Sequence, residues 1–492
     1  MSKFNAKSRP ASSSCPLAVI KINDMKYLKL FIIIPFFASN LAFGQEKIPM
    51  LSGNVKVSVQ NGTIECDLQL TELELPKDYS IRLNKGLNIL NMEVKNPDSF
   101  LVGFNRDFTD SIQSDETVSY YIPSNTKGEK FYPNNIRFRY VGKFPVVNDT
   151  IESKMQKEDW RGNVAFVKSN LRVDGLQSAW YPTIYDPINE LQYDQLKYDI
   201  TIDCNDCETM YLNGAIPTKG KSTNFKSEVA REPLLFIGKY NIQESETAYL
   251  LNSNFTNVEL KEIDELNNQI FDYLTNYTNI KYQDKIVWID GGVTAKKYGF
   301  AFFSYPAITV VGDPPHDLHT SLESYNSNSL TTIAHEISHY YFGNLKRSNS
   351  YLESLIDEGF AQFLAYKYVN QKKDSNFIRN EIIQAIEWFE DPNFEFKAML
   401  DFHKSENTND RETYAYDYQT AILFSIEKEI GEEKMKNWIR LLLQGEEPIS
   451  NKDFFKTTLK KAIKNDNIYN DIIDKYLTGN LTVENMKKLW TE

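Results

Sequence analysis

Residues 331–339 read Thr331-Thr332-Ile333-Ala334-His335-Glu336-Ile337-Ser338-His339. Apolar side chains recur through and around this stretch at the spacing of one helix face: Leu330, Ile333, Ile337 and Tyr341. Ser329 stands where an N-cap is expected, and Gly343 stands where the helix would end. The pattern predicts an amphipathic helix that runs to Gly343.

The two histidines of this helix are four residues apart, so their imidazoles leave the same face and can share one metal ion. Glu336 lies beside them, placed to take a proton from a water that the metal activates. Eighteen residues separate His339 from Glu358, enough for a turn through residues 344–350 and a second helix that returns alongside the first. We therefore predict that His335, His339 and Glu358 hold one zinc ion per chain, with Glu336 as the base.

Two imidazoles and one carboxylate leave the fourth tetrahedral position of zinc open, which is the arrangement of a catalytic site. A His-Glu-x-x-His match also arises by chance in unrelated chains. The helical context and the second segment around Glu358 favour the functional interpretation.

The composition is that of a globular protein, with 41% apolar and 25% charged residues in a chain of 492, long enough for two or three domains. The formal net charge is −12, and it becomes −17 (49 basic and 66 acidic residues) if residues 1–44 are removed. This acidic balance argues against nucleic acid or an anionic membrane surface as a partner.

Residues 1–44 have the features of an export leader, with Met25 as the expected start. Basic residues follow Met25, a short apolar run covers residues 30–37, and the small residues Ala42 and Gly44 suit a cleavage site. The run is too short to cross a bilayer, so we expect no membrane-spanning segment in the mature chain. We predict cleavage near Gly44 and a periplasmic or extracellular location; a buried strand or a retained anchor is the alternative.

Three cysteines follow this leader. Cys204 and Cys207 have the spacing of a redox or metal pair, but the chain has no second pair with which to build a thiolate zinc site. A short-loop disulfide is the favoured interpretation in an exported protein. Cys66 is then left over, and we expect it to be buried.

The chain changes character near Glu244. Before it, short alternating runs typical of strands are separated by turn residues; the clearest runs cover residues 55–59, 81–83, 136–141 and 198–202. After it come a long helical pattern from Val258, two strand-like runs at 285–289 and 307–311, and then mostly helical spacing from Ile382 to the end. We predict an α+β multidomain protein: a saddle- or sandwich-like β-domain over 45–243, a zinc domain over 244–445 and a short helical tail over 446–492.

The residues around the motif resemble the aminopeptidase N family of gluzincin metallopeptidases. That family shares the His-Glu-x-x-His motif, the eighteen intervening residues and the Glu, with Phe-Gly-Asn after the second His (here residues 342–344) and Glu-Gly-Phe-Ala at the third ligand (here residues 358–361). A β-rich domain with Trp-Tyr-Pro (residues 180–182) and a strand that ends in Asn213-Gly214 also fit the family's order. The resemblance covers most of residues 50–445 and implies a thermolysin-like catalytic domain that cleaves peptide bonds.

The resemblance also implies roles for single residues. Family members use a tyrosine to stabilise the tetrahedral intermediate, and Tyr416 takes that position, with Tyr414 and Tyr418 as competing candidates. Asp357, next to a ligand, could hydrogen-bond an imidazole, although an exposed helix carboxylate is the plain alternative.

Two departures from the family stand out. The family binds the free α-amine of its substrate through the Glu of a Gly-x-Met-Glu-Asn segment, and Ser304, followed by Tyr305, stands at that place here. A hydroxyl cannot pair with an ammonium as a carboxylate can. The large C-terminal helical domain of the family is also expected to be missing. His316 and His319, in a turn-rich stretch, are assigned to a solvated loop, with contact to substrate or a second metal as the alternative.

We therefore expect a zinc metallopeptidase, similar to an aminopeptidase, that acts on peptide or protein substrates. One alternative is that Ser304 directs it to internal bonds or blocked peptides. Another is a non-catalytic binding protein that keeps the fold and the metal site.

Overall fold

A computed structural model covers the whole chain and describes residues 48–491, apart from 96–97, 108–115, 148–163, 189–190, 293–298, 313, 315, 324–326, 347, 349, 351, 374, 392–396, 402–412 and 446–449. Residues 1–46 form a unit of their own, separate from 47–492. The predicted leader and its cleavage site at Gly44 lie outside the described residues. No helix in the described part of the chain is long and apolar enough to cross a membrane.

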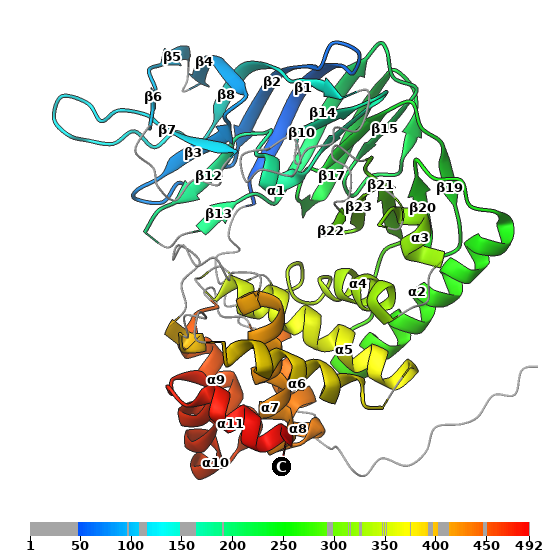
Figure 1. Cartoon of the computed structure of the whole chain (residues 1–492). Coiled ribbons are helices and arrows are strands. Elements are labelled where there is room, and N and C mark those ends of the chain that lie inside the picture. Colours follow the sequence, from blue (N-terminus) through cyan, green and yellow to red (C-terminus); the bar gives the residue numbers. More distant parts are fainter. Residues whose placement is uncertain are drawn as a thin grey trace, which may run out of the picture. The chain divides into compact units, whose positions relative to one another are not determined.

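The first part of the described chain is built from strands, as predicted (Figure 1). Alternating sequence folds into strands with one buried face; β14, for example, buries every second side chain over Leu196–Cys204. The described strands of this first part form three sheets. The first has the order β17 (Ser222–Arg231), β14, β1 (Met50–Ser58), β2 (Thr63–Thr71), β8 (Ile136–Lys143), β4 (Leu87–Lys95) and β5 (Ser99–Val102).

The second sheet has the order β16 (Thr218–Lys219), β15 (Thr209–Leu212), β18 (Leu235–Gly238), β11 (Asn170–Val173), β10 (Val164–Val167) and β9 (Val146–Val147). The third has the order β13 (Leu191–Tyr193), β12 (Thr183–Asp186), β3 (Ser80–Asn84), β7 (Thr117–Tyr121) and β6 (Asn105–Arg106). Their apolar faces share one core that includes Trp180 and Tyr181, and the short helix α1 (Gly175–Ser178) precedes these two residues.

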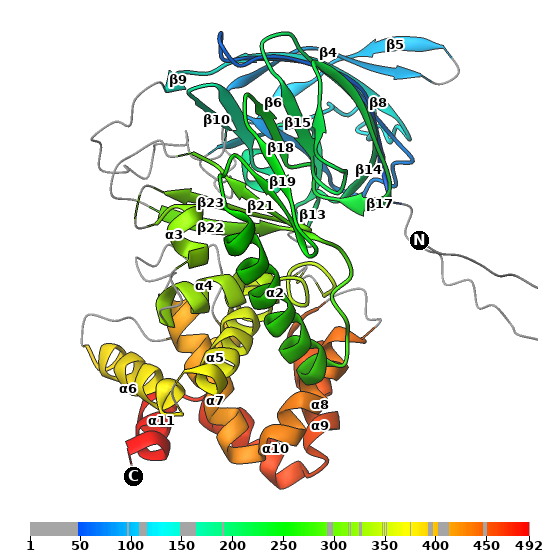
Figure 2. The same cartoon turned by 90° about the vertical axis from the view of Figure 1, so that its right-hand side faces the viewer.

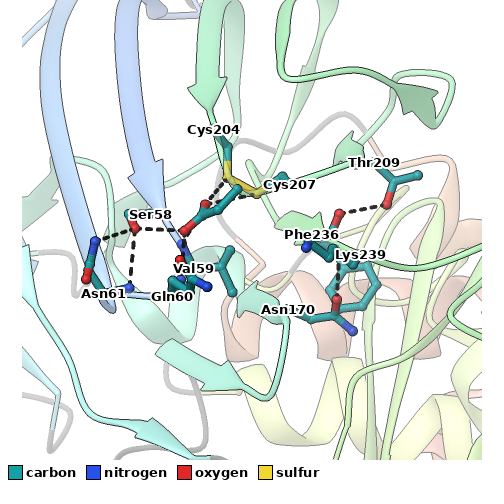
Figure 3. Close-up of a disulfide and its surroundings, with 12 residues drawn as sticks. Ser58, Val59, Gln60, Asn61, Asn170, Cys204, Cys207, Thr209, Phe236 and Lys239 are labelled. Carbon is teal, nitrogen blue, oxygen red and sulfur yellow. Dashed lines mark hydrogen bonds between the residues drawn. A yellow bond between two sulfur atoms is a disulfide. The ribbon is translucent and has the colours of Figure 1, made fainter.

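A disulfide joins Cys204 and Cys207 in the connection from β14 to β15, and Cys66 is free and buried, both as predicted. Figure 3 shows how the residues of this bend meet the turn between β1 and β2. Asp206, inside the disulfide loop, accepts hydrogen bonds from Ser58 Oγ (2.8 Å), Val59 N–H (3.1 Å) and Gln60 N–H (2.9 Å). Burial alone would raise the pKa of Asp206, but these hydrogen bonds lower it. The loop therefore ties two distant turns of the β-domain together.

A fourth sheet begins the second part of the chain, with the order β19 (Ile242–Glu244), β20 (Ala248–Leu251), β21 (Ile286–Asp290), β23 (Ala307–Gly312) and β22 (Gly299–Ser304). Strands β20, β21 and β23 are parallel, while β22 runs antiparallel to β23 and forms the edge of the sheet. Between β20 and β21 lies α2 (Asn257–Thr278), whose N-terminus is closed by a capping box between Thr256 and Glu259. This helix and the strands β21 and β23 correspond to the helix predicted from Val258 and the strands predicted at 285–289 and 307–311.

The remaining helices lie on one side of this sheet, and α4 (Ser327–Ser338) lies next to the edge strand β22 in both views (Figures 1 and 2). In chain order they are α3 (Leu318–Glu323), α4, η2 (Ser354–Gly359), α5 (Phe360–Lys372), α6 (Phe377–Phe389), η3 (Met399–Asp401), η4 (Thr413–Tyr418), α7 (Gln419–Ile430), α8 (Glu432–Leu443), α9 (Lys452–Ile463), α10 (Asp466–Ile472), η5 (Ile473–Leu477) and α11 (Thr482–Thr491).

The segment predicted as a short tail is helical and packs into the same core as α4 and α5. Phe455 of α9 contacts the rings of Phe360 and Trp438, and Trp490 of α11 donates its indole N–H to Ser425 Oγ at 2.9 Å. These helices are therefore part of the scaffold that holds the site.

One buried side chain links the β-domain to the edge strand. Asn213, directly after β15, donates through Nδ2 to the carbonyls of Ser304 (2.9 Å), Tyr305 (3.0 Å) and Glu232 (3.1 Å). Gly214 follows with φ +88°, a conformation that favours glycine. The Asn-Gly pair thus fixes the end of β22 against the β-domain.

Candidate metal centre and active site

The first two candidate ligands come from the end of α4. His335 and Glu336 lie in its last turn, and His339 follows its last residue, with its N–H donating to His335 O at 3.2 Å. The helix therefore ends at Ser338 rather than at Gly343, and Ser329 is an internal residue of α4 instead of its cap. After Ser338 the regular α-helical hydrogen bonds give way to bonds of other spans: Tyr340 N–H donates to Ile337 O, three residues back, and Asn344 N–H donates to His339 O, five residues back.

Gly343 makes this turn possible. Its φ is +118°, and a Cβ at this position would lie 3.3 Å from His339 O and 3.4 Å from His339 Nδ1. A side chain here would strain the backbone and press on the histidine.

The third candidate ligand lies on η2, a π-helical turn that carries Glu358 and continues directly into α5. Helix α5 packs against α4, so the second segment returns to the first as predicted. The rings of Phe342 and Phe360 stack 4.7 Å apart at this contact. A single wide turn at a helix start re-aims one side chain, and such turns are frequent at functional sites.

The ligand atoms of His335, His339 and Glu358, which we call the metal triad, converge on one point. The two Nε2 atoms are 3.0 Å apart, and Glu358 Oε2 lies 3.2 Å from His335 Nε2 and 3.4 Å from His339 Nε2. Tetrahedral zinc with bonds of about 2.0–2.2 Å separates its ligand atoms by about 3.3–3.6 Å. The triangle fits such an ion to within a few tenths of an ångström.

The charges of the triad favour a cation at its centre. Burial alone would lower the pKa of His339, but Glu358 and Glu336 raise it to about 9. Burial would likewise raise the pKa of Glu358, yet the two imidazoles hold it well below its usual range. Both shifts show that the three groups stabilise positive charge between them.

Neighbouring groups orient the ligands. The Nδ1–H of His339 donates to the carbonyl of Phe342 at 3.0 Å, which leaves Nε2 free to bind a metal. The ring of Phe303, from β22, stacks on the His339 imidazole at 6.0 Å. Asp357 Oδ1 accepts from Ser348 N–H at 3.2 Å, in the connection between α4 and η2. A contact between Asp357 and an imidazole stays a prediction.

Two further polar groups lie at the triad. Glu336 is buried, its Oε2 accepts no hydrogen bond from the described residues, and burial raises its pKa against the opposing effect of the two histidines. Tyr416 lies on η4, a second π-helical turn, with its ring centroid 5.6 Å from that of His335. Tyr416 is 37% exposed, whereas Tyr414 is 1% and Tyr418 is 0% exposed. Of the three tyrosines, Tyr416 is therefore the one whose ring faces both the triad and open space.

The two π-helical turns are locked side by side. Gln419, which follows η4, donates through Nε2 to Ser354 Oγ of η2 at 3.1 Å. A Cβ on Gly359 would lie 3.2 Å from the Gln419 side chain, so the small residue permits the close approach. This contact fixes Tyr416 relative to Glu358.

The residues at the family's amine-binding position are buried. Ser304 is 3% exposed and donates through Oγ to Glu232 Oε2 at 2.9 Å. Tyr305 packs against the rings of Tyr282 and Tyr340, and the Arg231 guanidinium lies 4.8 Å from its ring centroid. Substrate contact by Ser304 and Tyr305 stays a prediction. Glu232, which comes from the loop after β17, could not be identified from any sequence pattern.

A cavity of about 500 Å³ adjoins Glu336 between α4 and the β22–β23 pair. His316 also lines this cavity and packs against two glycines. A Cβ on Gly299 would lie 2.4 Å from His316 Cβ, and a Cβ on Gly312 would lie 2.4 Å from the His316 carbonyl oxygen. His319 lies apart from it: its ring stacks on Phe255 at 4.7 Å, and its Nδ1 is 3.0 Å from Glu323 Oε2.

With this geometry in place, we compared the chain with known proteins. Residues 296–476 match the family model described as the Peptidase family M1 domain. These residues are similar to a peptidase family M1 domain. The metal triad, Glu336 and Tyr416 all lie inside the matched residues, whereas Glu232 lies before them.

Curated relatives match the chain over 118 residues. These are glutamyl aminopeptidase from Bitis rhinoceros, 29% identical, and glutamyl aminopeptidase from Homo sapiens, 27% identical. The match covers 23% of this chain and 12% of each relative. The similarity is thus limited to a small part of those proteins.

Solved structures share the fold over most of the chain. Native yeast LTA4 hydrolase has a TM-score of 0.59 at 13% identity, covering 88% of this chain and 67% of that one. An M1 zinc metallopeptidase mutant from Deinococcus radiodurans, bound to a Tyr-Ser-Ala substrate, has a TM-score of 0.59 at 11% identity, covering 88% and 94%. The chain therefore shares with these structures the predicted fold, a β-rich part followed by a mostly helical part.

Proposed function

We propose that this chain is a zinc-dependent peptidase. The observation that carries the proposal is the convergence of two imidazole nitrogens and one carboxylate oxygen to within 3.0–3.4 Å, beside a buried carboxyl that is not a ligand. A purely structural zinc site needs four protein ligands and no such carboxyl. The M1 domain and the aminopeptidase names of the curated relatives support the same reaction class.

The residues divide the reaction between them. His335, His339 and Glu358 would hold the ion, which when bound supplies Lewis acidity to a peptide carbonyl and to water. Glu336 takes the proton of the attacking water and later delivers a proton to the leaving amine. Tyr416 donates its hydroxyl hydrogen to the carbonyl oxygen as negative charge develops there.

One experiment tests both peptide hydrolysis and its dependence on zinc. The purified chain is digested with an unbiased peptide library while its metal content is measured, then stripped with a chelator and reloaded with zinc. We expect cleavage that disappears on stripping and returns with zinc. A chain that binds zinc and peptides but leaves the library intact would instead be a binding protein that keeps the fold.

We further propose that the peptidase recognises free N-termini, despite Ser304. The family carboxylate is replaced by a hydroxyl, but Glu232 brings a carboxylate to within 2.9 Å of that hydroxyl. A carboxylate beside the end of β22 can pair with an ammonium group, which supports aminopeptidase activity. If Glu232 only accepts the hydrogen bond from Ser304 and does not contact substrate, the competing proposal follows, which is cleavage of internal bonds or blocked peptides.

Matched substrates separate the two specificities. A free aminoacyl amide and its N-acetylated form are compared on wild type, on Glu232→Gln and on the exposed control Glu228→Gln. Amine recognition predicts a strong preference for the free form, weakened at least about 10-fold in Glu232→Gln and kept in the control. Equal cleavage of both forms by wild type would refute it.

We also propose that the protein acts outside the cytoplasm. Support comes from the basic and apolar leader pattern and from the Cys204–Cys207 disulfide, a bond typical of oxidising compartments. Intact mass of the protein recovered from its natural source tests this proposal. A mature N-terminus near residue 45 is expected, and a retained leader would contradict it.

A further inference from the structure

The cavity beside Glu336, which we call the Glu336 pocket, is large enough to receive a side chain of the substrate. Its volume of about 500 Å³ falls within the range of about 300–1,000 Å³ of ligand sites. It lies between β22 and β23 on one side and the first turns of α4 on the other.

The residues at its mouth decide which part of a substrate it faces. Glu336 lines the pocket, whereas neither Tyr416 nor any member of the metal triad does. In the proposed reaction Glu336 delivers a proton to the leaving amine, so that nitrogen must come within hydrogen-bond reach of its carboxyl. The pocket therefore adjoins the leaving-group side of the scissile bond.

The residues that line the Glu336 pocket determine which substrate side chains it favours. The side formed by the sheet is apolar, with Trp288, Ile308 and Val310. Helix α4 adds Ile333 together with neutral polar groups such as Ser329 and Thr332. Among the described lining residues, Glu336 and His316 are titratable, and none is a lysine or an arginine. Among these described residues, an acidic side chain would meet the Glu336 carboxyl and no permanent cation. A glycine would leave the apolar lining in contact with water.

We propose that the Glu336 pocket makes this peptidase selective for a bulky uncharged residue, aromatic or long aliphatic, directly after the scissile bond. Thr332 from α4 and Ala301 from β22 set its width, since they line it from opposite sides. The inference rests on the proposed peptidase function, because that function orients the leaving group.

Two variants narrow the pocket from opposite sides. Thr332 is exposed and Ala301 is half-buried, so Thr332→Phe and Ala301→Leu add volume without removing a described catalytic group. The matched control is Thr331→Phe, the same change on the preceding residue of α4, which does not line the pocket. Thermal unfolding of all three variants verifies that each is folded.

Cleavage is measured on a peptide series that differs only in the residue after the cut. We expect wild type and Thr331→Phe to prefer phenylalanine over glycine and over glutamate by at least about 10-fold in kcat/KM. Thr332→Phe and Ala301→Leu should lose this preference while still cleaving the glycine peptide. Equal cleavage of the series by wild type, or a preference unchanged in both pocket variants, would overturn the inference.

A binding measurement separates this inference from the proposed function. L-phenylalaninamide is the kind of product that such a cut releases, and calorimetry compares its binding with that of glycinamide on the zinc-loaded protein. Binding of phenylalaninamide that Thr332→Phe abolishes supports the pocket even if no peptide is cleaved, a result that would refute only the peptidase function. Failure to bind phenylalaninamide better than glycinamide overturns the pocket.

Discussion

At the scale of single residues, the site depends on Glu336, a buried carboxyl beside the metal triad. Burial raises the pKa of Glu336, and the nearby histidines oppose that rise. A raised pKa makes a carboxylate a stronger proton acceptor, which suits a base that later returns the proton as an acid. Its fixed position beside the metal triad supplies the geometry.

Tyr416 makes a testable contribution. We expect Tyr416→Phe to lower kcat by about 10²–10³, because one hydrogen bond to the developing oxyanion is lost, while zinc content stays unchanged. Steady-state kinetics and metal analysis measure both.

The neighbouring tyrosine provides the control for this experiment. Tyr418→Phe removes a hydroxyl from a ring that is 0% exposed, and its kcat should stay within about 3-fold of wild type. A larger loss in Tyr418→Phe than in Tyr416→Phe would reassign the role.

Some residue roles could be assigned from sequence and others could not. His335, His339 and Glu358 are set by helical spacing and one short connection, so local geometry suffices to bring them together. Glu232 approaches Ser304 across 72 residues, and such a contact depends on the packing of two sheets. The spacing of Tyr414, Tyr416 and Tyr418 left three candidates, and the exposure of Tyr416 and its contact with His335 separate it from the other two.

At the scale of elements, two π-helical turns place the functional side chains. Sequence periodicity predicted helices around Glu358 and Tyr416, but it cannot show where a helix widens by one residue, because the apolar pattern on either side is unchanged. The early end of α4 was missed for a similar reason: Gly343 was identified, but it lies in the turn after the helix, where hydrogen bonds span three or five residues and leave no mark in the apolar pattern.

Gly343 should therefore affect both stability and metal binding. We expect Gly343→Ala to destabilise the fold by about 1–3 kcal/mol, because alanine is strained at this φ. It should also weaken zinc binding by at least about 10-fold, because its Cβ would press on His339. Denaturation and competition with a chelator measure the two effects.

Gly431 offers a matched control, since its φ is +88° and a Cβ there would meet nothing within 4 Å. Gly431→Ala should lose stability but keep its zinc affinity. Equal weakening of zinc binding in both variants would show that the effect on the metal is not local.

The Cys204–Cys207 loop should make the β-domain sensitive to acid. The pKa of Asp206 is lowered in the fold, so its contribution to stability is present above the unfolded value of about 3.9 and is lost as pH falls through the lower, folded value. We expect the Tm of wild type to drop below about pH 4 and Asp206→Asn to show a smaller drop. Calorimetry between pH 3 and 7 tests this, with Asp199→Asn on the exposed side of β14 expected to behave as wild type.

At the scale of the whole molecule, the β-domain supports the edge strand of the catalytic sheet. The order of strands and helices, and hence the fold class, could be predicted because alternation and helical spacing are properties of the sequence itself. The packing of α9 and α11 into the metal-bearing core could not, because Phe455 and Trp490 have the same apolar character whether they cover a separate tail or a shared core.

Asn213 tests this long-range support. We expect Asn213→Ala to cost about 2–4 kcal/mol of unfolding free energy, because it leaves the buried carbonyls of Ser304 and Tyr305 without this donor. It should also lower kcat/KM, since the end of β22 loses its anchor. Asn224→Ala removes two hydrogen bonds at an exposed site and should change neither.

The proposed peptide hydrolysis depends most on the metal triad and Glu336. The most direct measurement is the rate of peptide hydrolysis by wild type and by Glu336→Gln at equal, measured zinc content. We predict one zinc ion per chain in both proteins and a rate at least about 10²–10⁴ lower in the variant, because the metal is kept and the base is lost. Equal rates in the two proteins, or hydrolysis by wild type that persists without zinc, would contradict it.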